Sequence, residues 1–478
     1  MRFLFGILLL INFTPGNSQQ NSSFLSSFVQ RDVFKHATLS LTAIEVNGSN
    51  QVAAYRSEKS MVPASSFKVL STFSAIDLLG EDYRYNTTVG FTGELLDDGT
   101  LEGDLVIIGS GDPSLGSKHF SDKDDLSQLL DKIVKAVEDR GITCISGHVI
   151  SDDSYVQESA VVPDWKWDDI ANYYGAGAWG LNVHDNLYYI YFQQKAKEDQ
   201  VPQIRRYGPK VPGLTFHNKV KTGKQGSGDN AYIFGGPSNT QKTIEGTIPP
   251  GSKEFFIKGA IPDPPLFFAY HIYHALRDQE IKVDGYSRTN TPIASSESIQ
   301  KLVSFESVPM SDIAKKTNEK SDNIYAEALL HTLAKSKLAT ESYGDFIEDH
   351  MSSIGLDVGS FSMSDGSGLA TNNLISSKLL AEFLRYYGQN FGLQKSTDLL
   401  PLAGKEGTVK YFLQKRSCQG RVWAKSGSMG AVLSYCGYIK AKSGKWLSFS
   451  VIVNGFTVKH REVRKHLEDL IDHLYQEN

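Results

Sequence analysis

The chain has 478 residues, of which 40% are hydrophobic and 22% charged, and its formal net charge is −5 at pH 7. This length predicts two or three domains, and the composition is that of an ordinary globular protein rather than a disordered or fibrous one. No run of Lys and Arg is long enough to coat a nucleic acid, so no nucleic-acid partner is expected.

The first residues have the layout of a cleavable secretory signal. Arg2 precedes an apolar run from Phe3 to Phe13, and small, turn-forming residues follow at 15–18. We expect residues 1–18 to be a signal peptide, which predicts a secreted, periplasmic protein. The apolar run is shorter than the roughly 20 residues of a membrane-spanning helix. No second long run follows, so no integral membrane segment is expected after signal removal. A buried N-terminal helix or a membrane anchor is the alternative.

Two strands and a helix are predicted next along the chain. Residues 37–46 and 51–55 alternate as strands on either side of Asn47-Gly48, which favours a hairpin turn. A helix is expected over 65–79, with Gly80 at its end. Its apolar stripe consists of Val69, Leu70, Phe73, Ile76 and Leu79.

The middle and the end of the chain differ in character. Residues 87–307 are rich in Gly, Asp and short β-like runs, with an amphipathic helix over 125–140 and a polar, exposed loop over 218–228. Near the C-terminus, three strands and a closing helix are expected, at 421–427, 432–439, 446–453 and 462–475. Strands at both ends of the chain predict one α+β domain that the middle interrupts.

The three cysteines are an odd number for a secreted protein. In the hairpin register that we expect, Cys418 faces a residue about four places from Cys436, which is roughly 13 Å along a strand. A disulfide needs Cα atoms within roughly 7 Å. We therefore expect no structural disulfide, and because no Cys/His spacing resembles a zinc site, no metal and no cofactor.

The first motif that can carry chemistry is Ser65-Ser66-Phe67-Lys68. A serine three residues before a lysine places both side chains on one helical face, and N–H groups at a helix start can stabilise an oxyanion. Serine is a weak nucleophile without a base, so Lys68 would need a strongly lowered pKa. Alone, the pattern also fits a capping serine with a solvated lysine. It occurs a second time at Ser298 and Lys301, in a stretch that is typical of a strand.

Two further motifs indicate a catalytic site only when they are considered together with the first. Ser321-Asp322-Asn323 precedes a helical pattern, where the hydroxyl can pass a proton and the amide can hold a carbonyl; an ordinary N-cap is the alternative. Lys425-Ser426-Gly427 follows an apolar strand, and Gly427 permits close approach of a peptide. A second copy at 442–444 is better interpreted as a hairpin turn.

Taken together, the three motifs occur in the order known from β-lactamases and penicillin-binding proteins. The chain resembles the class C penicillin-binding proteins, the D-alanyl-D-alanine carboxypeptidase/endopeptidases of penicillin-binding protein 4 type, from about residue 35 to the end. The long stretch between the first two motifs is typical of that family. Further stretches that resemble family signatures are Gly109 to Leu115, Asp152 to Tyr155, Tyr174 to Ala176, Asp365 to Leu369 and Val453 to Phe456.

The resemblance implies a fold and a domain order. We expect an α+β protein with a β-lactamase/transpeptidase-like catalytic domain, an antiparallel sheet with helices on both faces, and inserted β-rich domains. The expected boundaries are 24–86 and 308–478 for the catalytic domain, 87–113 and 207–307 for domain II, and 114–206 for a nested domain III.

The resemblance also implies residue roles. Ser65 would attack the carbonyl between two D-alanines while Lys68 accepts its proton. Ser321 and Lys425 would carry a proton to the leaving amine. The expected binding groups are Asn323 for the substrate amide, Ser426, Gly427 and Ser428 with Lys425 for the terminal carboxylate, and the N–H groups of Ser65 and Ser428 for the oxyanion hole.

The partners implied are peptidoglycan stem peptides and β-lactam antibiotics, which would acylate Ser65. A departure from the family is Ser426, where threonine is frequent; the hydroxyl is kept. The rival hypotheses are a β-lactamase or esterase that uses the same serine, and a non-catalytic penicillin-binding sensor.

Overall fold

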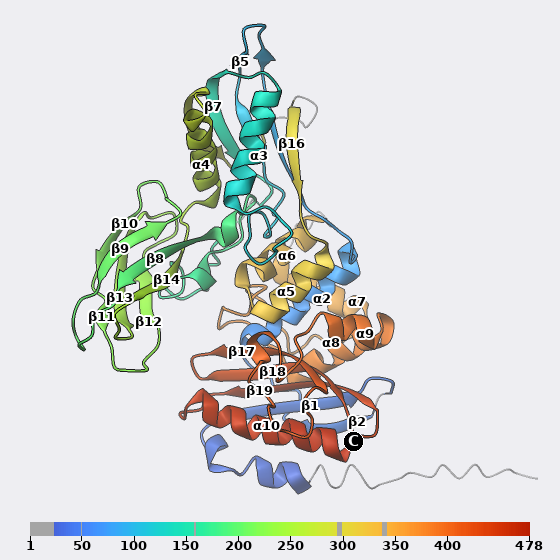
Figure 1. Cartoon of the computed structure of the whole chain (residues 1–478). Helices are drawn as coiled ribbons and strands as arrows, with labels where there is room; N and C mark the ends of the chain where they lie inside the picture. Colours follow the sequence, from blue (N-terminus) through green and yellow to red (C-terminus); the bar gives the residue numbers. More distant parts are fainter. Residues whose placement is uncertain (1–22, 49, 157–158, 294–298, 337–341) are drawn as a thin grey trace, which may run out of the picture. The chain divides into compact units, whose positions relative to one another are not determined.

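The computed structural model describes residues 23–48, 50–156, 159–293, 299–336 and 342–478 (Figure 1). The predicted signal peptide, residues 1–18, lies outside the described residues. Two compact units are formed. Unit 1 holds the described residues up to Pro63 together with Gly355–Phe361 and Leu374–Asn478, and unit 2 holds Ala64–Ile354 and Ser362–Asn373.

Unit 1 contains a five-stranded antiparallel sheet that joins distant parts of the sequence. Its strands are β1 (Thr38–Glu45), β2 (Gln51–Tyr55), β17 (Val422–Met429), β18 (Val432–Lys440) and β19 (Trp446–Asn454), in the order β17-β18-β19-β1-β2. β1 runs against β19, with Thr38 opposite Asn454 and Glu45 opposite Leu447. The predicted strands and their assembly from both ends of the chain are confirmed.

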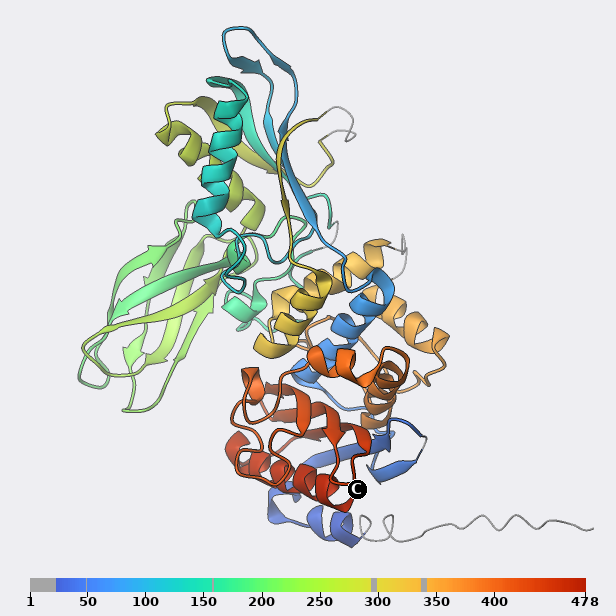
Figure 2. The same cartoon turned by 45° about the vertical axis from the view of Figure 1, so that its right-hand side comes forward.

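Helices cover this sheet on both faces, as the expected fold requires (Figure 2). Leu39 and Leu41 of β1 share a core cluster with Leu467 of α10 (His460–Glu477). The alternate residue Ser40 points to the opposite face and donates a hydrogen bond to Ser377 of α8 (Ser377–Asn390), 2.7 Å away. Further short helices of the unit are η1 (Asp32–Phe34), α9 (Leu393–Asp398) and η6 (Gly407–Val409).

None of the three cysteines forms a disulfide, as predicted. In the β17–β18 register Cys436 lies opposite Lys425, and Cys418 precedes β17. The second Lys-Ser-Gly copy at 442–444 forms the expected turn, because Gly444 donates its N–H to the carbonyl of Ala441.

Unit 2 begins with a helical core in which α2 packs against two later helices. The helices are η2 (Ala64–Phe67), α2 (Lys68–Leu79), α5 (Met310–Lys320), α6 (Asn323–Ser336) and α7 (Tyr343–Ser353). The predicted helix over 65–79 starts with a 3-10 turn and ends at Gly80, whose φ is 89°. All residues of α2 from Lys68 to Ile76 are buried. The small side chains of Ser71 and Ser74 let neighbours approach faces that lie outside the apolar stripe.

A seven-stranded sheet with two helices follows in unit 2. Its strands are β3 (Asn86–Phe91), β4 (Glu94–Leu95), β5 (Thr100–Glu102), β6 (Leu105–Ile108), β7 (Cys144–Asp152), β15 (Lys282–Thr289) and β16 (Gln300–Glu306). The helices α3 (Leu126–Asp139) and α4 (Pro264–Asp278) belong to the same hydrophobic core. α3 confirms the amphipathic helix expected over 125–140.

Two smaller sheets complete unit 2. One consists of β8 (Leu187–Gln193), β9 (Gln203–Gly208) and β14 (Glu254–Ala260), and the other of β10 (Thr215–Asn218), β11 (Lys221–Thr222), β12 (Asn230–Phe234) and β13 (Gln241–Ile248). Within 218–228 the prediction of an exposed loop is wrong for Val220 and Thr222, which are buried. Those two side chains fill the core beside β13, so only the residues after them form the polar turn.

The domain boundaries expected at 87, 114, 206 and 307 stay a prediction. Strand pairing nevertheless joins segments that were assigned to different domains. β7 of the expected domain III pairs with β6 and β15 of domain II, and β8 of domain III pairs with β14 of domain II. No helix within the described ranges is long and apolar enough to cross a membrane.

The start of α3 carries a testable stability prediction. Asp125 accepts a hydrogen bond from the N–H of Gln128, whose side chain in turn accepts one from the N–H of Asp125. We expect Asp125→Ala to lower the free energy of unfolding by about 1 kcal/mol, measured by urea denaturation. Asp131→Ala, on the exposed face of the same helix, is the control. Equal stability of the two variants would contradict the capping role.

Candidate active site

The predicted Ser-x-x-Lys pair lies at the junction of η2 and α2 in unit 2. Lys68 is fully buried, and its Nζ donates to the Oγ of Ser65 at 3.0 Å. The same Nζ donates to Asn323 Oδ1 and to the Ser367 carbonyl, both at 2.6 Å. An ammonium group uses all three of its N–H bonds in this way. A neutral Lys68 would release one of them and could offer its lone pair to the Ser65 hydroxyl.

The backbone before Ser65 has an unusual conformation. Ala64 is buried and has a φ of 48°, in the left-handed region that a residue with a Cβ seldom adopts. Gly368 approaches it so closely that a Cβ there would lie 2.2 Å from the Ala64 carbonyl oxygen. Strained positions of this kind gather at functional sites, where the surrounding structure holds them.

Burial dominates the electrostatics of Lys68. Removal from water lowers the pKa of its amine to about 8, while the nearby carboxylates of Asp365, Glu327 and Asp322 oppose the shift. This is the direction that a general base needs. The sequence required such a shift for Lys68 but did not show what would cause it.

The second motif forms a tight turn between α5 and α6, directly before the helix that the sequence predicted. Ser321 ends α5 in the left-handed conformation, with φ 58° and ψ 41°, and Asn323 is the first residue of α6. The Asn323 amide has two contacts, because its Oδ1 accepts from Lys68 and its Nδ2 donates to the carbonyl of Tyr174 at 2.8 Å. The turn therefore connects the first motif with the segment η3 (Tyr173–Gly175).

The loop over 365–369 contacts Lys68 through the carbonyl of Ser367. In the sequence this loop was noted only because it resembles a family signature. The two oxygens of buried Glu327 accept the N–H groups of Gly366 and Ser367 at 2.9 and 2.8 Å. Asp365, also buried, accepts the N–H groups of Gly368 and Ala370, both at 2.6 Å. These bonds fix the Ser367 carbonyl that receives the lysine. Sequence reasoning missed Glu327, although a single carboxylate inside the apolar run of α6 was the available signal.

The carboxyl group of Glu327 has a shifted pKa as well. Burial, reinforced by the charge of Asp365, raises the pKa of Glu327 to about 8. The indole N–H of Trp165 donates to Asp365 at 2.8 Å. Lys68 and Glu327 therefore titrate in the same range, and each proton-binding step belongs to the pair rather than to one residue.

Residues of the loop before α3 also contact the turn over 321–323 and the start of α6. Ser117 Oγ and Tyr325 OH lie 2.7 Å apart, and the Tyr325 hydroxyl donates to Asp185 at 3.2 Å. His119 forms an ion pair with Asp322 at 3.4 Å, and this contact raises the pKa of the imidazole. The turn that carries Ser321 and Asn323 is thus fixed on both sides.

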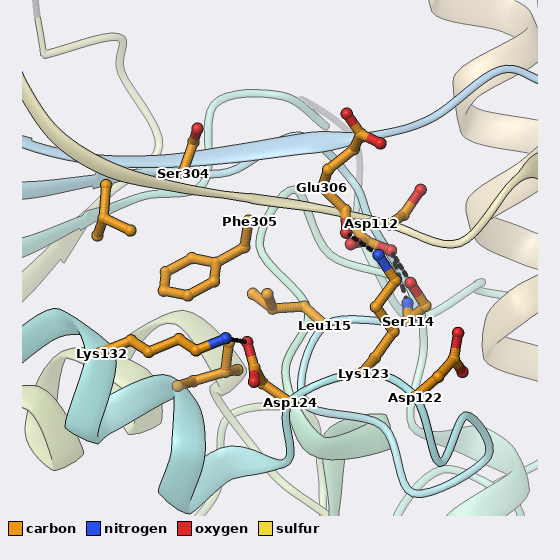
Figure 3. Close-up of a pocket in the computed structure, with 14 residues that line it drawn as sticks. Asp112, Ser114, Leu115, Asp122, Lys123, Asp124, Lys132, Ser304, Phe305 and Glu306 are labelled. Atoms are coloured by element: carbon orange, nitrogen blue, oxygen red, sulfur yellow. Dashed lines mark hydrogen bonds and ion pairs between the residues drawn. The ribbon is translucent and has the colours of Figure 1, made fainter.

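The same loop lines a pocket of about 370 Å³ on its other side (Figure 3). The pocket has an apolar floor that includes Leu115 and Phe305, and its two lysines are engaged. Lys132 pairs with Asp124 at 2.7 Å, and Lys123 donates to the carbonyl of Glu306 at 2.9 Å. None of the residues predicted to be catalytic lines it. This pocket is therefore not where the three motifs predict chemistry.

The third motif lies on β17 in unit 1. Lys425 is buried and donates to the carbonyl of Ser426 at 2.7 Å. The hydroxyl of Ser426 lies 2.7 Å from that of Thr408, Gly427 is buried, and Ser428 is exposed. Lys425, Ser426 and Gly427 lie on the strand predicted over 421–427, and β17 continues that strand to Ser428 and Met429.

The sequence profile of the D-Ala-D-Ala carboxypeptidase 3 (S13) family matches residues 22–477. The chain belongs to this family. Its membership confirms the resemblance, the fold class and the serine-type D-Ala-D-Ala peptidase class that the motifs predicted.

Relatives of this S13-family chain cover most of its length. It is 23% identical to the D-alanyl-D-alanine carboxypeptidase DacB of Haemophilus influenzae, over 91% of this chain and 90% of the relative. It is 24% identical to a D-alanyl-D-alanine carboxypeptidase of an Actinomadura species, over 83% and 73%. The crystal structure of penicillin binding protein 4 from Haemophilus influenzae matches with a TM-score of 0.82 at 22% identity, covering 95% and 99%; a complex of it with a β-lactam matches at 0.76.

Proposed function

We propose that this chain hydrolyses D-Ala-D-Ala peptides of peptidoglycan through an acyl-enzyme on Ser65. The observation that carries the proposal is the contact of Lys68 Nζ with Ser65 Oγ, made by a lysine whose pKa burial has lowered. Membership of the S13 family supplies the substrate class.

The reaction follows from the positions of the side chains in unit 2. Neutral Lys68 takes the hydroxyl proton of Ser65 as Oγ attacks the carbonyl carbon of the scissile bond. The C–N bond then breaks, the amine leaves with a proton, and water hydrolyses the ester to regenerate Ser65. Asn323 accepts from Lys68 through Oδ1 and donates to the Tyr174 carbonyl through Nδ2. Because an amide has a second N–H and a second lone pair, the same side chain can also bind a substrate amide.

The remaining roles are part of the same proposal. Ser321 and Lys425 carry the proton to the leaving amine, and the N–H groups of Ser65 and Ser428 form the oxyanion hole. Lys425, Ser426 and Ser428 bind the terminal carboxylate, and Gly427 lets the peptide approach the strand. Two observations support the binding roles proposed for residues of β17. Ser428 is exposed, and the hydroxyl of Ser426 contacts that of Thr408.

β-Lactams are proposed to acylate Ser65, as a relative of this chain has been crystallised with a β-lactam. We further propose a secreted, periplasmic location, which is supported by the composition of residues 2–18. Peptidoglycan stem peptides are accessible only in such a compartment.

One experiment tests the reaction and separates it from its rivals. The purified protein is incubated with a short peptide that ends in D-Ala-D-Ala and with a cross-linked muropeptide dimer, and products are identified by mass. The protein is also labelled with benzylpenicillin, and the modified residue is mapped. We expect release of D-alanine, cleavage of the dimer or both, and a penicilloyl group on Ser65. Rapid penicillin turnover would show a β-lactamase, and labelling without peptide cleavage would show a sensor.

The pH dependence of peptide cleavage follows from the buried pair. Below pH 8 Lys68 is an ammonium ion with no lone pair, so it cannot accept the Ser65 proton. We expect kcat/KM to rise with pH along a limb centred near 8, measured from pH 5.5 to 9.5. Because Glu327 titrates in the same range, the midpoint belongs to both groups. A rate that falls across pH 7–8.5 would contradict a neutral Lys68 as the base.

A further inference from the structure

An exposed row of aromatic and cationic side chains crosses the three-stranded sheet of unit 2. In β8, Tyr188 and Ile190 are buried, whereas Tyr189 and Tyr191 are only partly covered and lie on the other face. Phe256 of β14 is 49% exposed and lies directly opposite Tyr191. A folded protein has no structural need for an exposed phenylalanine beside two tyrosines, and apolar patches of this kind mark binding surfaces.

The rings form one connected cluster. The centroid of Phe256 lies 5.8 Å from that of Tyr191 and 5.8 Å from that of Tyr189. The two tyrosines are 6.5 Å apart, with an angle of 31° between their planes. Their spacing comes from the strand geometry, since residues two apart on β8 share a face. The cluster therefore offers a firm surface of adjacent rings and not separate mobile side chains.

Three cations lie close to the rings of Tyr189 and Tyr191. The guanidinium of Arg206, opposite Tyr191 on β9, lies 3.5 Å from that ring centroid. Lys258 of β14 and Lys118 lie 5.9 and 5.6 Å from the ring of Tyr189. Arg206 also pairs with the carboxylate of Glu254 at 3.1 Å. The row therefore presents cationic groups beside its rings in a chain whose net charge is negative.

The row continues toward the candidate active site within the same unit. Lys258 Nζ lies 5.6 Å from the ring of Tyr173, which is 53% exposed. Asn172, just before, forms a β-bridge with Gly259 of β14. The carbonyl of Tyr174 accepts the hydrogen bond from Asn323. A polymer lying on the row would thus reach the residue that is proposed to hold the substrate amide.

We propose that the row of Tyr173, Tyr189, Tyr191, Arg206, Phe256 and Lys258 binds the glycan chain of peptidoglycan. The inference rests on the proposed function and names the polymer that presents the peptide to Ser65. The apolar C–H faces of pyranose rings stack on exposed aromatic rings, and the carboxylates that this polymer carries pair with Arg206 and Lys258. A repeating chain of sugar rings matches a row of rings better than a single small ligand does.

The test uses the double variant Tyr191→Thr with Phe256→Thr, since threonine keeps the strand preference. The control is Tyr232→Thr on β12, which removes another exposed tyrosine (43%) from the second sheet of the same unit. Binding is measured by co-sedimentation with insoluble peptidoglycan, and with the same polymer after an amidase has removed its peptides. Release of D-alanine is compared between insoluble peptidoglycan and a short soluble peptide, and penicillin labelling reports folding.

We expect the double variant to bind both polymers at least about tenfold more weakly than the wild type. Its activity on the polymer falls by a similar factor relative to its activity on the short peptide, and the Tyr232→Thr control keeps wild-type binding. Unchanged binding by the double variant would overturn the inference, as would a wild type that binds only the peptide-bearing polymer. A wild type that binds stripped glycan but cleaves no peptide would instead refute the proposed function and leave the glycan surface standing.

Discussion

Replacing Ser65 by alanine is expected to lower kcat/KM for D-alanine release by about 10⁴-fold or more and to abolish labelling by penicillin. The methyl group cannot form the ester, and Lys68 loses the hydroxyl that its Nζ contacts at 3.0 Å. The fold should not change, because Ser65 lies on a short 3-10 turn in which the buried residues are its neighbours Ala64, Ser66 and Phe67. Mass spectrometry of products and of the labelled protein provides both measurements.

The sequence itself supplies a matched control for this variant. Ser298→Ala alters the serine of the second Ser-x-x-Lys copy, whose lysine is the exposed Lys301 at the start of β16. It should keep wild-type cleavage and labelling. If Ser65→Ala were still acylated by penicillin, the nucleophile would have to be another residue, and the assignment of all three motifs would fall.

Replacing Lys68 by methionine is expected to lower kcat/KM by about 10³-fold, the contribution typical of a general base. Methionine fills a similar volume, but it leaves Asn323 Oδ1 and the Ser367 carbonyl without the cation that they share. The limb of the pH profile near 8 should disappear together with the rate. Penicillin should label the variant slowly, because the serine remains but its base is missing.

Loss of stability alone would also lower activity, so a second buried lysine serves as the control. Lys242 on β13 is 3% exposed, burial lowers its pKa to about 8, and it donates to the carbonyl of Gly236. Lys242→Met therefore removes a comparable buried amine from unit 2 outside the three motifs. A drop in kcat/KM equal to that of Lys68→Met would show that the effect is structural and would remove Lys68 from the mechanism.

Much of the fold could be predicted because the hydrophobic patterns and the residues at the ends of helices indicate the same elements in this chain. The strands of unit 1 alternate or run apolar, Gly80 ends α2 in a conformation that suits glycine, and Asp125 caps α3. The motif residues were found for a similar reason. Ser65 lies at the start of a helical segment, Ser321 between two helices and Lys425 on a strand. The neighbouring residues predict each of these elements.

The rest depends on contacts between residues far apart in the sequence. Nothing local to Glu327 shows that its oxygens accept the N–H groups of Gly366 and Ser367, or that this loop holds Lys68. The buried state of Thr222 likewise accompanies the pairing of β11 with β13. The aromatic row arises only when the registers of β8, β9 and β14 bring its members to one face. Sequence periodicity specifies which residues share a strand face but not which strands are neighbours.

The pairing of β1 with β19 also determines the order in which the chain can fold. During synthesis all of unit 2 up to Ile354 emerges before β19, so β1 stays without its neighbour while several hundred later residues are made. Contacts between residues far apart in the sequence form slowly, and a strand edge that is still unpaired can aggregate with other chains. Unit 2 can acquire its core as soon as its own residues are available. The five-stranded sheet of unit 1 can close only after β19 has been made, so a chain that stops earlier keeps Leu39 and Leu41 exposed and is open to proteases.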